Sequence, residues 1–412
     1  MNKYKLTKLS NGIRVATEKI EHVNSFSLGF WFNVGSRDET KKNNGISHFL
    51  EHMFFKGTKR RTARRISEEI ESVGGYLNAF TSKEHTCLYG RGMDKHLKKT
   101  FLVLADMVQD SLFSEKELRK EAGVIIDELN DIEDSPEELI FDKFETKLYE
   151  GNKLSMPIIG TKENILNFTS LDLKNYVAQN YKADNFCIVA SGNIEHDVLL
   201  NLTEKYLTKI NSVAPKRRKY FNRSKNQDSF FYKNINQAHL IIGGTTYGYN
   251  SEQRAVSSLI SNILGDGSSS RLFQALRERN GIAYQVNSFL NSFYDVSSIG
   301  VYLSTNEESI KKGRDIVFRE LQKFKEKGVK TKELERAKEY IKGNIQLSIE
   351  STTNRMMRMA NSLFYFKRIK EIEESLQNID AITEEQIYEE VQIIFDNSNI
   401  STTLLASKNL LN

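Results

Sequence analysis

The chain has 412 residues, which at about 100–200 residues per domain allows two or three domains. Hydrophobic residues make up 39% and charged residues 27%, a composition that supports sizeable cores and excludes a disordered chain. The 59 Lys and Arg residues against 54 Asp and Glu residues leave a formal net charge of +5. This mild excess is far from the dense basic footprint of a nucleic-acid-binding protein.

Cysteine usage and the N-terminus bear on the cellular compartment. Cys87 and Cys187 cannot build a disulfide framework, and each lies in an apolar, strand-like run, which predicts two core residues. The first residues, MNKYKLTKLSNGIRV, contain no apolar segment typical of a secretory signal. No stretch approaches the roughly 18 consecutive apolar residues of a membrane span. We therefore expect a cytoplasmic protein without a membrane partner.

The first half of the chain mixes strand and helix patterns. The turn at Asn11-Gly12 between two short apolar runs predicts a hairpin. Ser114, with Glu117 three residues later, forms a capping box that predicts the start of a helix. Strand patterns cover 4–6, 12–16, 25–34, 76–90 and 186–191, and helical patterns cover 45–55, 62–72, 95–110, 114–131, 136–149 and 171–179.

The second half repeats this order, which indicates a duplicated unit of about 200 residues. Strands mixed with helices, without strict alternation, favour an α+β fold. The segment 212–227 carries Pro215 and a basic cluster and is expected to be a solvated connector. We predict domains at 1–214 and 228–412, joined by a linker at 215–227. In the second half, strand patterns cover 238–245, 283–289, 297–304 and 400–406, and helical patterns cover 253–264, 271–279, 308–325 and 332–349.

The strongest local signal is the segment His48-Phe49-Leu50-Glu51-His52. Residues four apart lie on one face of a helix, so His48 and His52 can direct their imidazoles at one ion. Glu51 lies on the same side, where it can accept a proton from a water on that ion. Zinc suits such a site because it has no redox chemistry and lowers the pKa of bound water. This H-x-x-E-H order is the inverzincin signature.

Two histidines leave a catalytic zinc one protein ligand short. The segment EAGVIIDELN at 121–130 offers carboxylates, and Glu121 and Glu128 are two helical turns apart on one helix face. The apolar residues at 124–126 indicate burial nearby. The spacing alone does not choose between Glu121, Asp127 and Glu128.

The chain resembles the pitrilysin-type zinc peptidases, most closely the shorter members that include the bacterial processing peptidases and the β subunit of mitochondrial processing peptidase. The resemblance is carried by the segments at 35–37, 45–58 and 75–86. It implies that the third zinc ligand is Glu128, 76 residues after the second histidine. It also implies that the auxiliary glutamate of the family is Glu121, which orients a ligand histidine.

The same resemblance implies roles for residues that would otherwise be ordinary strand or surface positions. Asn78, Ala79 and Phe80 resemble the edge strand that binds an extended peptide through its backbone. In the second half, Arg277 and Tyr284 resemble a pair that reaches toward the zinc site. A guanidinium and a phenol can both donate hydrogen bonds to the oxyanion of the reaction.

The resemblance covers nearly the whole chain and implies two homologous α+β domains, each a mostly antiparallel sheet with helices packed on one side. Residues 1–214 would be the catalytic zinc-binding domain, and 228–412 the domain that contributes the Arg/Tyr pair. Relatives of this length form dimers whose four domains enclose a chamber. We therefore expect a homodimer, with a heterodimer containing another subunit as the alternative.

Together, these features predict a zinc metalloendopeptidase that hydrolyses peptides or unfolded protein segments, with Zn²⁺ as its cofactor. The alternative is a non-catalytic peptide-binding or scaffold subunit of the same fold. Such relatives lose a ligand or the motif glutamate, whereas this chain retains all of them. A nucleic-acid-binding module would rest only on the basic cluster at 216–225, and we expect no nucleic-acid partner.

Overall fold

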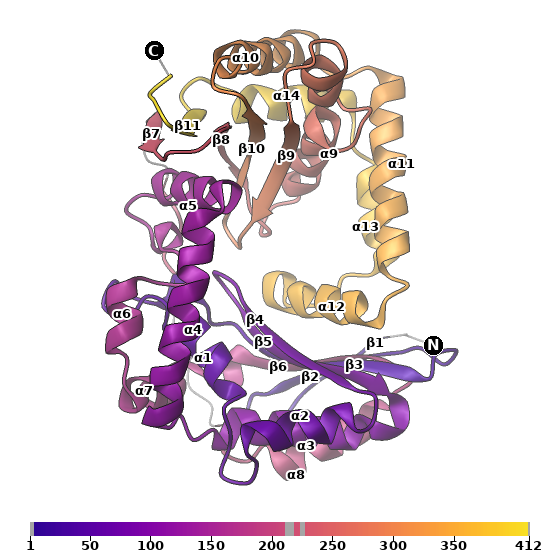
Figure 1. Ribbon diagram of the computed structural model, residues 1–412. Coiled ribbons are helices and arrows are strands. Elements are labelled where there is room, and N and C mark those ends of the chain that lie inside the picture. The colour runs from indigo at the N-terminus through magenta and orange to yellow at the C-terminus, as the bar shows by residue number, and fades with distance from the viewer. Residues whose placement is uncertain (1–3, 211–217, 223–226, 411–412) are drawn as a thin grey trace. The chain divides into compact units, whose positions relative to one another are not determined.

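A computed structural model describes residues 4–210, 218–222 and 227–410 (Figure 1). They form two compact units, each with helices around its own β-sheet. The predicted α+β fold with two domains is confirmed. The first unit comprises the residues up to 129, residues 156–219 and residues 348–369, and the second comprises residues 130–155, residues 220–347 and the residues from 370 onward.

The first unit is built on a six-stranded mixed sheet with the strand order β1-β2-β6-β3-β5-β4. All neighbouring strands are antiparallel except β2 and β6, which are parallel. Strand β4 lies at one edge of the sheet. The strands are β1 (Tyr4–Lys8), β2 (Arg14–Lys19), β3 (Ser25–Phe32), β4 (Tyr76–Thr81), β5 (Thr86–Met93) and β6 (Phe186–Gly192).

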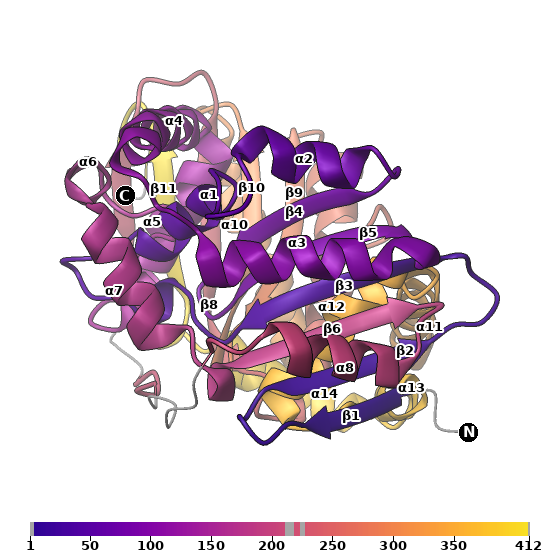
Figure 2. The ribbon, with the colours of Figure 1, turned by 90° about the horizontal axis from the view of Figure 1, so that it is seen from below.

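Helices cover both faces of this sheet, so the prediction of helices packed on one side was wrong in this detail: α12, from the second half of the chain, covers the other face. On β3, Phe30 packs against Phe101 of α3 with ring centroids 5.3 Å apart, whereas Trp31 faces Phe364 of α12 at 6.5 Å. Because both faces are buried, β3 reads as a continuous apolar run. Figure 2 shows α2, α3 and α8 across the face opposite α12. The helices are α1 (Ile46–Phe54), α2 (Ala63–Glu71), α3 (Leu97–Asp110), α4 (Glu115–Asp134, up to Leu129 in this unit), α6 (Lys162–Asn167), α7 (Ser170–Asn180), α8 (His196–Tyr206) and α12 (Thr352–Phe366).

The second unit has a five-stranded sheet with the order β7-β11-β8-β10-β9. A core of α9, α10 and α14 side chains packs on one face of it. Ile140 and Phe144 of α5 pack with Ile241 and Tyr302 on the opposite face. The elements are α5 (Pro136–Leu148), β7 (Ser229–Tyr232), β8 (Ala238–Tyr247), α9 (Gln253–Gly265), the π-helical turn η5 (Phe273–Glu278), β9 (Gln285–Ser292), β10 (Val296–Thr305), α10 (Ile310–Lys327), α11 (Thr331–Ser348), α13 (Ile372–Asp380), α14 (Glu384–Ile394) and β11 (Ser401–Ala406).

The two sheets have the same topology. The order β2-β6-β3-β5-β4 in the first corresponds to β7-β11-β8-β10-β9 in the second, with the single parallel pair at the same place. This agrees with the expected duplication. Each unit also includes a helix from the other half of the chain, α12 in the first and α5 in the second. The units therefore differ from the continuous segments 1–214 and 228–412, and most of the predicted linker at 215–227 lies outside the described residues.

The strand expected over 76–90 is in fact two strands joined by a turn. The Ser82 N–H donates to the His85 carbonyl at 2.7 Å, and the Ser82 hydroxyl accepts from the His85 N–H at 3.0 Å. Glu84 in this turn is buried and accepts from Arg37 at 2.7 Å and from Tyr365 at 3.0 Å. The turn separates β4 from β5, and the strand order places β4 at the edge of the sheet.

Three smaller expectations have clear outcomes. Both cysteines are buried and unpaired, as predicted. Arg218 of the basic connector is not solvated, since its guanidinium pairs with the Asp38 carboxylate at 2.6 Å. Among the residues that the structure describes, no helix combines the length and the apolar composition needed to cross a membrane.

Candidate metal centre

Helix α1, which carries the H-x-x-E-H segment, is fixed at its first turn by a buried carboxylate. Glu39 Oε2 accepts from the Gly45 N–H at 2.8 Å and from the Asn44 side chain at 2.9 Å. Glu39 Oε1 accepts from the Ser47 N–H at 2.8 Å. A negative charge at a helix N-terminus satisfies free N–H groups and interacts favourably with the helix dipole. Gly45 has a φ of +99°, so a side chain there would strain the turn into α1.

This contact predicts a stability effect away from the reacting groups. Glu39→Gln would turn an NH₂ group toward backbone N–H donors and leave one of them unsatisfied in a buried site. We expect a loss of about 1–3 kcal/mol in the free energy of unfolding, measured by chemical denaturation. Glu71→Gln, at an exposed carboxylate at the end of α2, is the control and should change stability by less than about 0.5 kcal/mol. Equal stability of the two variants would contradict the capping role of Glu39.

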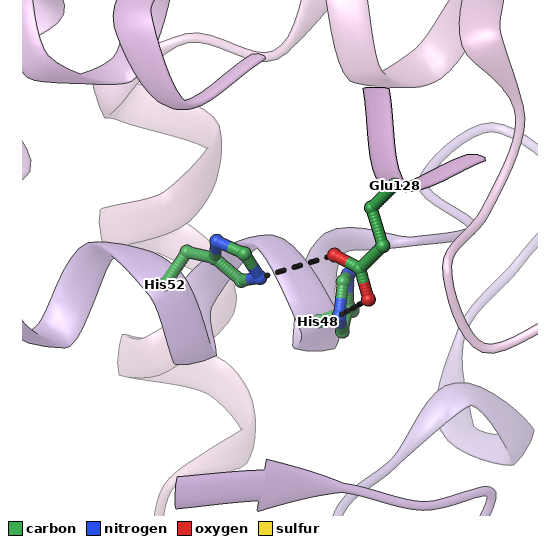
Figure 3. A group of neighbouring side chains, drawn as sticks. All are labelled: His48, His52 and Glu128. Atoms are coloured by element: carbon green, nitrogen blue, oxygen red, sulfur yellow. Dashed lines mark ion pairs between the residues drawn. The ribbon is translucent and has the colours of Figure 1, made fainter. Parts of the chain in front are cut away.

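His48, His52 and Glu128 lie together in the first unit. The Glu128 carboxylate, from α4, lies between the two imidazoles of α1, as Figure 3 shows. Its Oε1 is 3.6 Å from His48 Nε2, and its Oε2 is 3.5 Å from His52 Nε2. One nitrogen of each histidine and one carboxylate oxygen all lie within 4.8 Å of one another. Two imidazole nitrogens and a carboxylate oxygen form the donor set of many catalytic zinc sites.

The helical spacing left three carboxylates as candidates for the third ligand, and the structure gives each of them a different environment. Glu128 faces both histidines, and Asp127 beside it is exposed. Glu121 is buried behind His52, and its Oε2 lies 3.3 Å from His52 Nδ1. If His52 donates its Nδ1–H to Glu121, its Nε2 lone pair is free to bind a metal on the Glu128 side. The other oxygen of Glu121 pairs with Lys56 Nζ at 2.7 Å.

In the metal-free protein, burial and neighbouring charges determine the protonation states of the two histidines and Glu128. Burial lowers the pKa of His48 to about 4, which keeps its imidazole neutral, the form that binds metals. Burial also acts to lower the pKa of His52, but the Glu128 and Glu121 carboxylates outweigh it, so that pKa is raised. The hydrogen bond with His52 lowers the pKa of Glu128. The carboxylate therefore stays ionised between the two rings.

Glu51 lies on α1 between the histidines and is largely buried. Burial raises the pKa of its carboxyl, although hydrogen bonds from Thr81 act in the opposite direction. A raised pKa is suited to a group that first accepts and then donates a proton near neutral pH. Since Thr81 ends β4, the same contact places Glu51 beside the edge strand.

The predicted peptide-binding residues lie on this edge. Asn78 and Ala79 pair with Tyr89 and Leu88 of β5, and Phe80 pairs with Cys87. Asn78 is exposed, and its side-chain oxygen accepts from the Ala79 N–H at 2.9 Å. The side-chain nitrogen of Asn78 donates to the Tyr76 hydroxyl at 2.8 Å. An added strand could replace the local contact at the Ala79 N–H with a backbone hydrogen bond.

Arg277 and Tyr284 belong to the second unit. Arg277 lies in η5 with its guanidinium 5.2 Å from the centre of the Phe273 ring. Tyr284 precedes β9, and 73% of its residue surface is exposed. Their expected role at the metal centre stays a prediction.

Comparison with known proteins decides the family. Residues 14–162 match the family model "Insulinase (Peptidase family M16)", and residues 167–341 match "Peptidase M16 inactive domain". The chain belongs to peptidase family M16. The metal cluster lies within the residues matched by the first of these M16 models, and Arg277 and Tyr284 lie within those matched by the second.

Relatives and solved structures agree with this M16 assignment. An uncharacterized zinc protease of Bacillus subtilis is 34% identical over 380 residues, which is 92% of each chain. An uncharacterized zinc protease of Rickettsia bellii is 33% identical over 405 residues, 97% of each chain. A protease from Helicobacter pylori has the same fold, with a TM-score of 0.91 at 21% identity, covering 98% of this chain and 99% of that one.

The residues of this M16 chain fit a zinc ion. His48 and His52 would each offer Nε2 and Glu128 a carboxylate oxygen, and a catalytic zinc with three protein ligands of this kind keeps one position open for water or substrate. The hydrogen-bonded carboxylate behind His52 is the usual outer partner of a zinc-bound histidine. Sequence reasoning gave no role to Glu39 or Lys56, and it placed Thr81 in the edge strand without connecting it to Glu51. Lys56 and Thr81 lie in segments that carried the family resemblance, but the partners of all three residues become visible only in the fold.

Proposed function

We propose that this chain is a zinc metalloendopeptidase that hydrolyses peptides and unfolded protein segments. The observation that carries the proposal is the convergence of His48, His52 and Glu128, with Glu51 on the same helix as the two histidines. The relatives named zinc proteases support the metal and the class of reaction. The M16 model with the description "inactive domain" matches residues outside this cluster, so it does not favour a non-catalytic scaffold.

In this mechanism each group of the chain has a defined task. A zinc ion on the three ligands would supply an acidic water and polarise the scissile carbonyl. Glu51 accepts the proton of the attacking water and then delivers it to the leaving amine. The free edge of β4 aligns the substrate backbone, and Thr81 connects that strand to Glu51. Arg277 and Tyr284 would donate hydrogen bonds to the developing oxyanion.

The edge strand also supports the proposed class of substrate. Backbone pairing with β4 requires an extended segment, which peptides and unfolded chains provide and most folded surfaces do not. We further propose a homodimer whose enclosed chamber admits only such segments, by analogy with family members of this length. The two buried, unpaired thiols fit the reducing cytoplasm, which is the compartment that we propose.

The proposal predicts that cleavage requires metal. The purified chain, digested with a diverse peptide library, should cleave internal bonds, lose this activity with a chelator and regain it when zinc is added back. A stably folded protein offered at the same concentration should stay intact until it is denatured. The products would be identified by mass spectrometry. Cleavage that is unchanged by complete metal removal, or no cleavage by the fully zinc-loaded chain, would contradict the proposed function.

A further inference from the structure

We propose that Lys56 is a positioning residue for the metal centre, acting through Glu121 on His52. This inference rests on the proposed function, because it concerns how the zinc ligand is held. Lys56, Glu121 and His52 are connected by two successive contacts. Lys56 Nζ is 2.7 Å from Glu121 Oε1, and Glu121 Oε2 is 3.3 Å from His52 Nδ1. The two oxygens of one carboxylate thus serve one partner each.

The burial of Glu121 separates this pair from an ordinary surface salt bridge. Only 7% of the Glu121 side chain is exposed, against 31% for Lys56. A buried carboxylate with a single partner would pay a desolvation cost without full compensation and would shift toward other rotamers. Lys56 supplies the second partner and so keeps Glu121 turned toward His52. The imidazole is then held in the tautomer and ring orientation that a metal requires.

Lys56 also occupies a place in the chain that suits this task. It lies two residues beyond the end of α1, and its backbone N–H donates to the Met53 carbonyl at 3.2 Å. Its side chain therefore reaches from the end of the helix that carries both histidines to α4, the helix that carries Glu128. The ion pair holds together the two elements that supply the three predicted ligands.

A second lysine–glutamate ion pair in the same region has no contact with a predicted zinc ligand and serves as a control. Lys120 Nζ lies 2.9 Å from Glu117 Oε1 on the same helix α4, with side-chain exposures of 59% and 28%. Lys120→Met removes the same charge as Lys56→Met, but from the residue next to Glu121 in the sequence, whose partner is Glu117 and not Glu121. A general effect of charge on the metal would appear in both variants, whereas positioning through Glu121 would appear only at Lys56.

The test measures the zinc dissociation constant of the purified full-length chain by competition with a chelator of known affinity. Lys56→Met should weaken zinc binding by up to about 10-fold, the lower end of the range for loss of the direct outer partner of a ligand histidine, because Glu121 itself remains. Lys56→Arg should restore most of the affinity because a cation can still pair with Glu121. Lys120→Met should bind zinc like the unaltered chain. The absorption spectrum of the Co²⁺-loaded protein should change in Lys56→Met and return in Lys56→Arg.

A double variant shows whether Lys56 acts through Glu121. In a Glu121→Gln background, Lys56→Met should add little further loss, because the group that it positions has already changed. Undiminished zinc affinity in Lys56→Met, the same loss in Lys120→Met, or an equal loss with and without the Glu121 carboxylate would each overturn this inference. If the unaltered chain binds no zinc at all, the proposed function itself fails, so the two failures are distinguishable.

Discussion

Replacing Glu51 by glutamine should leave zinc bound and remove almost all peptide cleavage. The amide has nearly the shape of the carboxylate but cannot accept the proton of the attacking water. Loss of a general acid–base group typically slows an enzyme about 10²–10⁴-fold, and we expect a fall in kcat of about 10³-fold or more. Because Glu51 is not one of the three converging ligands, zinc content and KM should change little. Steady-state cleavage of a quenched fluorescent peptide, together with metal analysis of the same sample, measures both.

Glu51→Gln therefore distinguishes a general base, whose loss abolishes cleavage, from a metal ligand, whose loss would also release zinc. Thr81 offers a control, since Thr81→Val removes a hydroxyl that acts to lower the pKa of Glu51 but keeps the carboxylate. That control should retain most of the activity and shift its pH dependence. Turnover of Glu51→Gln within a few-fold of the unaltered chain would mean that another group takes the proton.

The second large effect is expected at Glu128. Glu128→Gln replaces an ionised oxygen ligand by a neutral amide, which binds zinc poorly. The zinc dissociation constant should rise by more than the roughly 10–100-fold typical of outer partners, and activity at limiting zinc should fall accordingly. Asp127→Asn removes the same charge from the adjacent, exposed position and should leave both quantities unchanged. Zinc binding is measured by chelator competition at constant pH.

The pair of variants also tests the choice among neighbouring carboxylates. If Asp127→Asn weakened zinc as much as Glu128→Gln, the effect would be one of net charge on α4 and not of a bond to the ion. Unaltered zinc affinity in Glu128→Gln would exclude this residue as a ligand.

The sequence predicted best those site residues that lie close together along the chain. His48, Glu51 and His52 lie on two turns of one helix, so helical periodicity alone places them together. Glu128 comes from a helix far along the chain. The two-turn spacing on that helix predicted a shared face, and the family resemblance named the residue. The burial of Glu121 and the exposure of Asp127 distinguish the three carboxylates only once the helix packs.

Contacts between segments far apart in the chain could not be predicted either, because sequence patterns report only local spacing. The segment 76–90 was predicted as one strand, although its four consecutive polar residues at 82–85 interrupt the strand pattern and mark the turn at Ser82–His85. Helix α5 was predicted over 136–149, but neither its sequence nor its position in the chain shows which sheet it covers, and the same holds for the position of α12. Glu39 caps α1 from seven residues before its first residue, through loop geometry that no common motif describes.

Two histidines of α1 and one glutamate of α4 are proposed to hold a single zinc ion, and X-ray absorption at the zinc edge of the loaded protein measures this ligand set. We expect one zinc per chain with two imidazole nitrogens at about 2.0–2.1 Å, oxygen ligands completing the shell, and no sulfur. A shell with sulfur, or with fewer than two imidazoles, would contradict this ligand set.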